Sequence, residues 1–250
     1  MIEREKDLLH LLEVKKYVSI NDLCKKLFVS EATIRRNLNS LEKQGLIRRT
    51  RGGAFYIENN HLEWPLLYKN KENIDKKIRI ANLAVDFVKD GQTLFIDSSS
   101  TCLYFTRRLS EKKDLTVLTN GITTSNLLSD ETDVNVYCTC GQVYSKRSSI
   151  NGPETCDYIL RHKADIAFTS CRGLDANFGT SDFSEGESMV KKSFHKRADK
   201  TILLVDSSKF NQTFFNQTFS IQDIDVAISD KEFPENIALA FNKYNIQMVW

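Results

Sequence analysis

The sequence has 250 residues, of which 41% are hydrophobic, 10% aromatic and 27% charged, with a formal net charge of +2 at pH 7. This length predicts one or two globular domains, and no apolar run approaches the roughly 18 residues that a membrane span needs. Ten glycines, three prolines and no low-complexity tract exclude a disordered or collagen-like chain. Because the first residues lack the basic and apolar regions of a signal peptide, we expect a cytoplasmic protein with no membrane partner.

Positive charge is concentrated at the N-terminal end of the chain. Residues 1–57 hold 12 Lys and Arg against 7 Asp and Glu, whereas residues 58–250 hold 23 against 26. A basic N-terminal segment joined to a mildly acidic remainder predicts that only the first segment meets a polyanion such as DNA.

The first 57 residues have the periodicity of a winged helix-turn-helix domain. Helices are predicted over about 2–16, after Ser19 and over about 30–44, and residues 46–57 form two short strands around a Gly-Gly turn. The polar face of the third helix and the basic hairpin suit DNA grooves and phosphates. The residues assigned to DNA binding are Ser30, Glu31, Thr33, Arg35, Arg36, Asn39, Ser40, Lys43, Arg48, Arg49 and Arg51. The alternative is a three-helix module that docks on a protein and has a solvated basic face.

A motif in the third helix and the hairpin is specific enough to indicate a family. Residues 29–38 read V-S-E-A-T-I-R-R-N-L, and they are followed by L-E at 41–42 and R-G-G-A at 51–54. This pattern resembles the signature of DeoR-family bacterial transcriptional repressors. Asn37 stands where the family usually has Asp, and Arg51 stands where it usually has His. The resemblance implies that the partner is double-stranded operator DNA.

The rest of the chain predicts a linker followed by an α/β domain. Residues 58–72 lose the periodicity around His61, Trp64 and Pro65, and Trp64 either packs between the domains or is exposed. The fold class is therefore α/β: a winged helix-turn-helix domain over 1–57, the linker over 58–72, and a larger Rossmann-like domain that senses an effector over 73–250. Its sheet is expected to be mainly parallel, with helices on both faces.

The elements of the α/β domain follow from its apolar runs. The first helix is predicted over about 73–89, and its apolar residues are Ile74, Ile78, Ala81, Val85 and Val88. Strands are predicted at 93–96, 115–118, 134–138, 164–169, 202–205, 226–228 and 246–249.

The cysteines and histidines show no metal-ligand spacing. There is no C-x-x-C pair, and the four histidines are scattered. We therefore expect no metal, no cofactor and reduced thiols that are buried or half-buried. The cysteines are Cys24, Cys102, Cys138, Cys140, Cys156 and Cys171.

Polar residues follow four of the predicted strands. They stand at 97–101, 119–121, 140–141 and 206–209. Because open α/β sheets bind ligands at the carboxyl ends of their strands, these segments predict an anion site. The candidate cations are Lys191 and Lys209, and the candidate acceptors for sugar hydroxyls are Asp97, Asn120 and Asp175. Any one of these loops alone is explained as well by a helix cap.

The resemblance to the DeoR family extends over nearly the whole chain. It includes D-S at 97–98, T-N at 119–120, E-x3-K at 187–191 and D-S-S-K-F at 206–210. It implies a domain similar in fold to ribose-5-phosphate isomerase and glucosamine-6-phosphate deaminase, with a phosphorylated sugar or related metabolite as effector. It also implies phosphate binding by residues 98–101, where Ser99 replaces the family's Gly. The effector-binding residues assigned in this way are Asp97, Ser98, Ser99, Ser100, Thr101, Asn120, Gly141, Asp175, Glu187, Lys191 and Lys209.

These patterns favour a transcriptional regulator over an enzyme. We expect a repressor of sugar metabolism genes that binds its operator as a homo-oligomer, because repeated half-sites reward paired domains, and that joins the nucleoid when bound. The alternative is a sugar-phosphate isomerase or deaminase with an accessory N-terminal domain, using Glu187, Asp97 or Asp175 as its base. That reading leaves the winged domain unexplained, so no catalytic residue is assigned.

Overall fold

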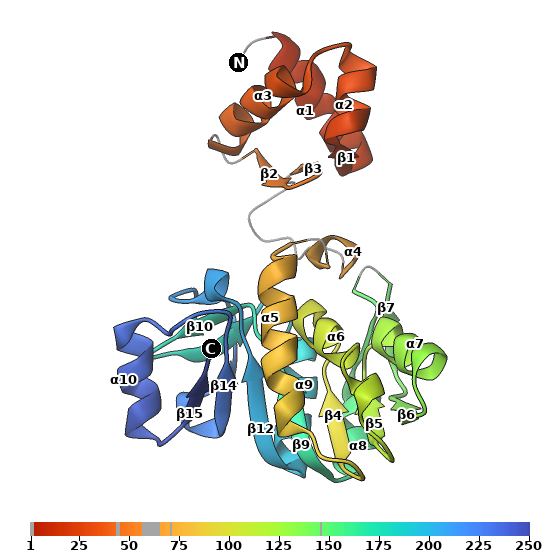
Figure 1. Ribbon diagram of the computed structural model, residues 1–250, viewed down its shortest axis with the longest axis vertical. Helices are drawn as coiled ribbons and strands as arrows, with labels where there is room; N and C mark the ends of the chain where they lie inside the picture. Colours follow the sequence, from red (N-terminus) through yellow and green to blue (C-terminus); the bar gives the residue numbers. More distant parts are fainter. Residues whose placement is uncertain (1–2, 44–45, 57–65, 71, 146) are drawn as a thin grey trace. The chain divides into compact units, whose positions relative to one another are not determined.

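The computed structural model describes residues 3–43, 46–56, 66–70, 72–145 and 147–250. The chain divides into two compact units, an N-terminal unit, Met1–Glu63, and a C-terminal unit, Trp64–Trp250 (Figure 1). Most of the predicted linker, with His61, Trp64 and Pro65, lies outside the described residues. Among the helices that are described, none combines the length and apolar character needed to cross a membrane.

The N-terminal unit packs three helices against a small antiparallel sheet. Its elements are α1 (Glu3–Lys15), β1 (Tyr17–Ser19), α2 (Ile20–Leu27), α3 (Glu31–Lys43), β2 (Ile47–Thr50) and β3 (Gly53–Tyr56). The strand order is β1-β3-β2, so a strand that the sequence did not predict completes the hairpin. The Ser19 hydroxyl accepts a hydrogen bond from the amide of Asp22 at 3.0 Å and caps α2. Ser30 accepts one from the amide of Thr33 at 3.3 Å at the start of α3.

The C-terminal unit is built around a seven-stranded sheet whose pairs are all parallel. The strand order is β15-β14-β12-β9-β4-β5-β6. These strands are β4 (Thr93–Ile96), β5 (Thr116–Thr119), β6 (Asn135–Cys138), β9 (Ala164–Thr169), β12 (Ala198–Leu204), β14 (Val226–Ile228) and β15 (Gln247–Val249). The predicted α/β fold with a parallel sheet is confirmed.

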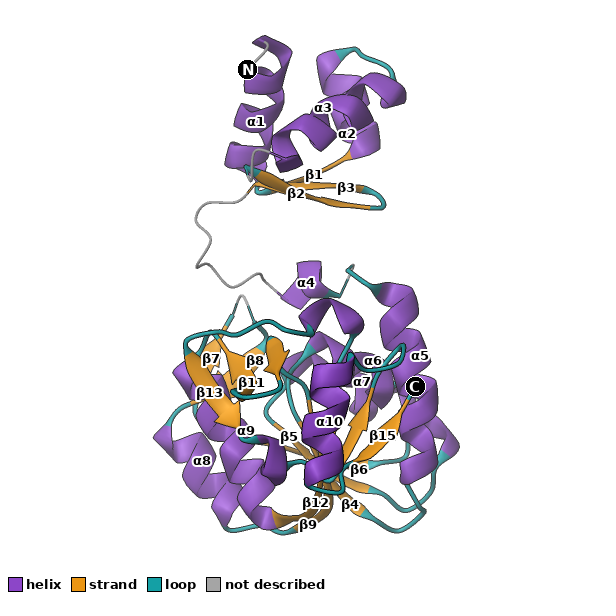
Figure 2. Ribbon diagram, turned by 90° about the vertical axis from the view of Figure 1, so that its left-hand side faces the viewer, coloured by secondary structure: helices purple, strands orange, loops and turns teal. Residues whose placement is uncertain are grey.

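Helices lie on both faces of this sheet (Figure 2). The helices of this unit are α4 (Leu66–Lys69), α5 (Ile74–Ala84), α6 (Ser100–Thr106), α7 (Ile122–Glu131), α8 (Pro153–Leu160), α9 (Glu185–Arg197) and α10 (Glu235–Lys243), of which α4 lies beyond the end of the strands. Alternate residues of β4 face opposite layers, since Leu94 and Ile96 pack with α5, α6 and α7 while Phe95 packs with α8 and α9. Both faces of the central strands are therefore buried, as a parallel sheet requires.

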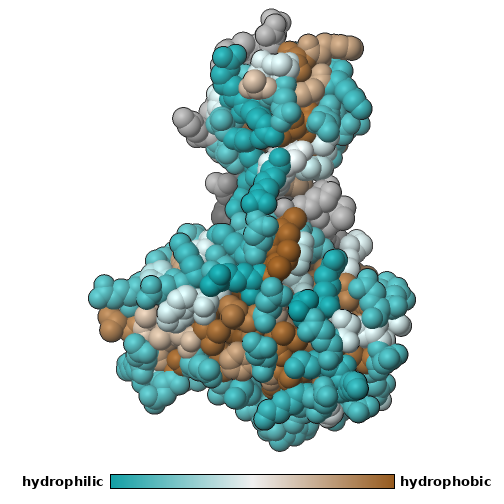
Figure 3. All heavy atoms as spheres, viewed as in Figure 1, coloured by the Kyte–Doolittle hydropathy of each residue, from teal (hydrophilic) through white to brown (hydrophobic). Residues whose placement is uncertain are grey.

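The first helix of this unit is shorter than predicted, and it buries a lysine. α5 ends at Ala84, and its buried residues are Lys77, Ile80, Ala81 and Ala84. Of the five apolar residues that the sequence gives this helix, Ile74 and Ile78 are 37% and 44% exposed, whereas Ala81, Val85 and Val88 are buried. Figure 3 shows apolar atoms on the surface of this face of the unit, where α5 lies in front. Lys77 can be buried because its amine donates to a backbone carbonyl inside the unit.

Two small antiparallel sheets complete the C-terminal unit, and neither was predicted. One pairs β7 (Gln142–Tyr144) with β8 (Ser149–Asn151), and the other has the order β10-β11-β13. The latter strands are β10 (Gly173–Asp175), β11 (Gly179–Asp182) and β13 (Asn216–Phe219). Cys138 and Cys140 are exposed rather than buried or half-buried, because β6 is the last strand at its edge of the large sheet.

Candidate functional site

The polar face of α3 is exposed because its apolar face is wholly used in the core. Ile34, Leu38 and Leu41 are fully buried against the other helices of the N-terminal unit. Among the residues assigned to DNA binding on this helix, Arg36 and Asn39 are exposed. The helix therefore presents a guanidinium and an amide to solvent, which are the groups that read guanine and adenine edges in the major groove.

Side-chain contacts within α3 organise its first turns. The Arg35 guanidinium pairs with Glu31 one turn earlier, with Nε at 2.8 Å and Nη2 at 2.6 Å from Oε1. The hydroxyls of Ser30 and Thr33 lie 3.0 Å apart. Glu31 thus orients the guanidinium of Arg35. Ser40 is half-buried, and the side chain of Lys43 lies outside the described residues.

The hairpin β2–β3 supplies the wing. The amide of Arg49 donates to Oε1 of Glu42 on α3 at 2.8 Å, which ties the wing to the helix that precedes it. Arg48 and Arg51 are exposed, and Arg49 is half-buried. Gly53 is required by close packing, since a Cβ there would lie 2.4 Å from the carbonyl oxygen of Val18.

In the C-terminal unit the predicted polar residues converge between β4 and β9. The strand order reverses there, because the chain adds strands on one side of β4 and then returns to the other side of it. Asp97 follows β4 and is 1% exposed. Its Oδ2 accepts from the amide of Ser170, which follows β9, and its Oδ1 accepts from the amide of Ser99, both at 2.8 Å. The carboxylate therefore joins the ends of the two strands at the point where such sheets bind ligands.

The predicted phosphate loop becomes the first turn of α6. Ser99 has an ordinary extended backbone (φ −70°, ψ 154°), and its hydroxyl accepts from the amide of Cys102 at 3.2 Å. A glycine is therefore not needed for conformation at this position. Lys209 reaches the same turn from the end of β12, with Nζ 3.3 Å from the Thr101 hydroxyl and 3.0 Å from the Ser170 hydroxyl.

Lys191 is buried beside two carboxylates. Its Nζ lies 2.8 Å from Oδ2 of Asp182 and 3.8 Å from Oδ2 of Asp97. Burial alone would lower the pKa of this amine, but Asp182, Asp97 and Glu187 together raise it above its ordinary value. The ammonium ion is therefore permanent. Glu187, one turn earlier on α9, faces Arg147 across 3.7 Å.

Asn120 ends β5 with an incompletely bonded amide. Its Nδ2 lies 3.4 Å from the Ser98 hydroxyl, 3.1 Å from the carbonyl oxygen of Ile150 and 3.3 Å from Oδ1 of Asn151. Because a carbonyl only accepts, the contact to Ile150 fixes which end of the amide is nitrogen. The Asn120 Oδ1 is buried and has no hydrogen-bond partner within the structure. A buried acceptor of this kind requires a donor from elsewhere.

The structure does not bring every predicted site residue to this place. Asp175 closes its own β10–β11 turn, where Oδ1 accepts from the amides of Asn177 and Phe178, both at 2.9 Å. Gly141 packs behind the site, since a Cβ there would lie 2.2 Å from the Thr155 hydroxyl. Ser100, in the first turn of α6, is 7% exposed.

Sequence reasoning missed several residues of this site. Asp182 forms an ion pair with Lys191, and the amide of Ser170 donates to Asp97. Asn151 and Arg147 come from the unpredicted β7–β8 hairpin. Only Asp182 carried a local signal, as the last of three polar residues that end a short strand. Within the described parts of the chain, no group of His, Cys, Asp and Glu side chains is arranged to hold a metal ion.

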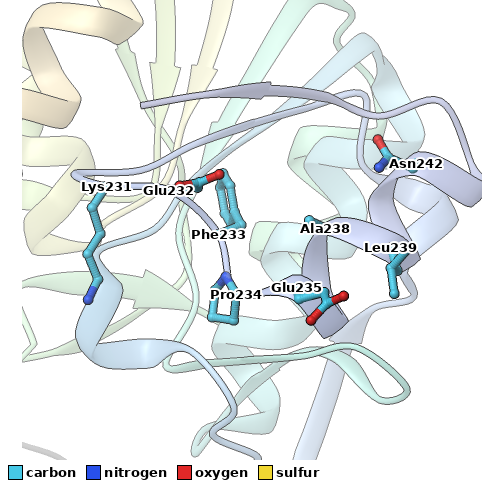
Figure 4. A pocket seen from close by; sticks show the side chains of 8 residues that line it. All are labelled: Lys231, Glu232, Phe233, Pro234, Glu235, Ala238, Leu239 and Asn242. Atoms are coloured by element: carbon cyan, nitrogen blue, oxygen red, sulfur yellow. The ribbon is translucent and has the colours of Figure 1, made fainter.

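A hollow lies away from these residues, at the start of α10 (Figure 4). None of its lining residues was predicted to bind DNA or an effector. They are Lys231, Glu232, Phe233, Pro234, Glu235, Ala238, Leu239 and Asn242.

Known proteins match both units. Residues 4–60 match the family described as DeoR-like helix-turn-helix domain, and residues 72–231 match the DeoR C terminal sensor domain. The chain is 32% identical to the HTH-type transcriptional regulator YulB of Bacillus subtilis (strain 168), over 91% of this chain and 88% of that protein. It is 27% identical to the glycerol-3-phosphate regulon repressor of Escherichia coli (strain K12), over 98% and 97%.

A solved structure also matches part of the chain. Ribose 5-phosphate isomerase A of Methanocaldococcus jannaschii aligns over 56% of this chain and 55% of that chain, with 20% identity and a TM-score of 0.42. Because this identity and this TM-score are low, the description of the fold given above rests on the strand order of this chain and not on the match.

Proposed function

The chain belongs to the DeoR family of transcriptional regulators, and from this premise we propose that it is a repressor of sugar metabolism genes controlled by a phosphorylated sugar or related metabolite. The N-terminal unit binds double-stranded operator DNA, and the C-terminal unit binds the effector. Repeated half-sites in the operator favour a homo-oligomer. The protein acts in the cytoplasm, at the nucleoid when it is bound.

The DNA-binding proposal is supported by the division of α3 into two faces. One face is fully buried in the core, while Arg36 and Asn39 project from the other. The exposed Arg48 and Arg51 extend this polar surface onto the wing and suit phosphates or the minor groove. A docking module for proteins would gain nothing from an exposed helix of base-reading side chains beside a basic hairpin.

The observation that carries the effector proposal is the unpartnered Oδ1 of Asn120. This buried acceptor belongs to a side chain that contacts Ser98, in the loop that leads to Thr101, and the Lys209 amine contacts the Thr101 hydroxyl. A sugar hydroxyl supplies the donor that Asn120 lacks, and the Lys209 ammonium supplies the charge that a phosphate requires. The name of the E. coli relative, a glycerol-3-phosphate regulon repressor, supports a small phosphorylated effector.

We propose no catalytic activity. Isomerisation needs a carboxylate that can take a proton from the substrate. Both oxygens of Asp97 accept backbone N–H groups, Asp175 closes a turn, and Glu187 faces a guanidinium. Turnover of a sugar phosphate by the purified protein would overturn this part of the proposal.

Calorimetry with a panel of sugar phosphates tests the effector site. We expect one member to bind to the wild-type protein, and binding to weaken about tenfold or more in Asn120→Ala and in Lys209→Met. Lys243→Met, which removes a lysine of α10 outside the site, is the matched control and keeps wild-type affinity. If no sugar phosphate binds, or if both site variants bind as tightly as the control, the effector assignment is wrong.

A selection of operator sequences from random duplex DNA tests the other half. We expect a repeated half-site, and an affinity for it that changes when the sugar phosphate found by calorimetry is added. If the protein selects no DNA sequence, the proposal that it represses genes by binding an operator is wrong.

A further inference from the structure

The short helix α4, at the start of the C-terminal unit, accepts hydrogen bonds from side chains on α5 and α6. α4 is a single turn, and the carbonyl groups at the end of a helix lack partners within it. The Tyr104 hydroxyl donates to the carbonyl oxygen of Asn70 at 2.9 Å, and the Lys77 amine donates to the carbonyl oxygen of Lys69. Tyr104 lies on α6, the helix whose first turn contains Thr101. The position of α4 therefore depends on α5 and α6.

The same segment is tied to the end of β12. Asn73, which precedes α5 with a φ of 51°, donates from Nδ2 to Oδ1 of Asp206 at 3.2 Å and to the Ser208 hydroxyl at 3.1 Å. Lys76 donates to the Ser207 hydroxyl at 2.8 Å. The loop that carries Lys209 to the effector site is thus bonded to the residues directly after α4.

Asp206 is shared between the two sides of this arrangement. Its Oδ2 lies 3.4 Å from Nζ of Lys209, while its Oδ1 accepts from Asn73. Asp206 is 1% exposed, so its charge is balanced by these neighbours rather than by water. If an anion draws the Lys209 ammonium away from Asp206, the carboxylate loses one of its partners. Its hydrogen bond from Asn73 then becomes more important.

The charges of Lys209 and Asp206 also affect the pKa of Lys77. Burial, together with the nearby ammonium groups of Lys209 and Lys69, lowers its pKa to about 7, although the carboxylates of Asp206 and Glu72 oppose this shift. A negative group placed beside Lys209 offsets the repulsion between the two lysines. The charged form of Lys77, which makes the stronger hydrogen bond to the carbonyl of Lys69, is then favoured.

We propose that Asp206 couples the effector site to α4: an anion that engages Lys209 shifts Asp206 toward Asn73 and Lys77, and both side chains then hold residues 66–73 more firmly. In the chain, α4 is the first described element of the C-terminal unit after the DNA-binding unit. This inference deepens the proposed function and rests on its assignment of Lys209 to the effector.

Hydrogen–deuterium exchange of the full-length protein, with inorganic phosphate as the probe, tests the coupling. In the wild-type protein we expect phosphate to slow exchange in residues 66–73 by about fivefold or more. Asn73→Gly removes the amide while keeping the left-handed backbone free of strain, and it should abolish this protection. Because coupling is reciprocal, the phosphate affinity measured by calorimetry should fall by about the same factor of five. Lys76→Ala is the matched control, because it removes a bond to the same loop that does not reach Asp206, and it should keep the protection.

The possible outcomes separate the coupling from the site. If phosphate binds to the wild-type protein and exchange in residues 66–73 does not change, or if Asn73→Gly keeps full protection, the coupling is wrong and the effector site stands. If phosphate does not bind, or binds equally well to Lys209→Met, the effector site itself is wrong and the coupling falls with it.

Discussion

The ammonium of Lys191 lies 2.8 Å from a carboxylate oxygen of Asp182, and both side chains are almost completely shielded from water. Removing one member of a buried pair leaves an uncompensated charge, which costs far more than the pair itself contributes. We expect Asp182→Ala to lower the free energy of unfolding by about 3 kcal/mol or more, as measured by urea denaturation.

The exposed pair of Lys163 and Asp199 provides the control. Its charged atoms are 2.7 Å apart, close to the separation in the buried pair, but the two side chains are 64% and 61% exposed. Asp199→Ala should cost no more than about 1 kcal/mol. Equal losses from the two variants would mean that burial of Lys191 does not determine the stability of this site.

Asp206 predicts a dependence of stability on acid. Burial would raise the pKa of this carboxyl group, but Lys209 and the hydrogen bonds from Ser208 lower it to about 2, from an ordinary value of 3.8. The native state therefore binds the proton more weakly than the unfolded chain. The resulting stability, about 2 kcal/mol, is present above pH 4 and is lost as the pH falls from about 4 to 2. Asp206→Asn should have a flatter stability profile over that range, and a profile as steep as that of the wild type would contradict the prediction.

Lys77 predicts a second rise in stability with pH, in the alkaline range. Its pKa is about 7 in the native state and 10.5 in the unfolded chain, so the unfolded chain binds more protons between these values. The free energy of unfolding should therefore gain a rising contribution from pH 7 to 10.5. Lys77→Met lacks that contribution. Urea denaturation of both proteins at pH 7 and pH 10 measures the difference, and parallel profiles would show that Lys77 is not buried as described.

Gly53 and Gly52 distinguish packing from turn geometry in the wing. A Cβ on Gly53 would lie 2.4 Å from the Val18 carbonyl oxygen and 2.8 Å from the ring of Tyr17, whereas a Cβ on Gly52 would meet nothing closer than 3.7 Å. Gly53→Ala should therefore separate β3 from β1, speed amide exchange in residues 46–56 and weaken operator binding. Gly52→Ala should leave both measurements near wild type, and a similar loss in the two variants would refute the packing explanation.

Substitutions of Arg36 and Arg48 are expected to affect DNA binding differently. Arg36 lies on the exposed face of α3, so Arg36→Ala should cost about 1–3 kcal/mol of operator affinity and relax the base preference at one position. Arg48 lies on the wing strand, so Arg48→Ala should weaken all duplexes alike and reduce the salt dependence by about one ion. Binding to a set of single-base operator variants at several salt concentrations separates the two effects. Identical profiles would show that α3 is not the reading helix.

Much of the N-terminal unit was predictable because its determinants are local. The cap at Ser19, the cap at Ser30 and the apolar positions of α3 lie within one or two helical turns of the residues they organise. The third strand, β1, was missed because three residues between two helices carry no periodicity.

In the C-terminal unit the sequence located the strands and the polar residues that follow them, and it failed where charge is buried. Lys77 is 3% exposed, and nothing in the apolar pattern of its helix indicates this. Its burial depends on Lys69 and Asp206, which lie on other elements. Residue by residue, the pattern on α5 gives no sign of either partner.

The sequence by itself determined the two kinds of domain and placed polar groups at the carboxyl ends of strands, because apolar periodicity and capping act over a few neighbouring residues. Only the tertiary structure decided which of those groups meet. Asp97 and Ser170 are bonded across 73 residues of chain, and Asn120 is left with an unpartnered oxygen beside the β7–β8 hairpin. Such contacts depend on the order in which strands assemble, and the free energy that selects that order is spread over the entire core.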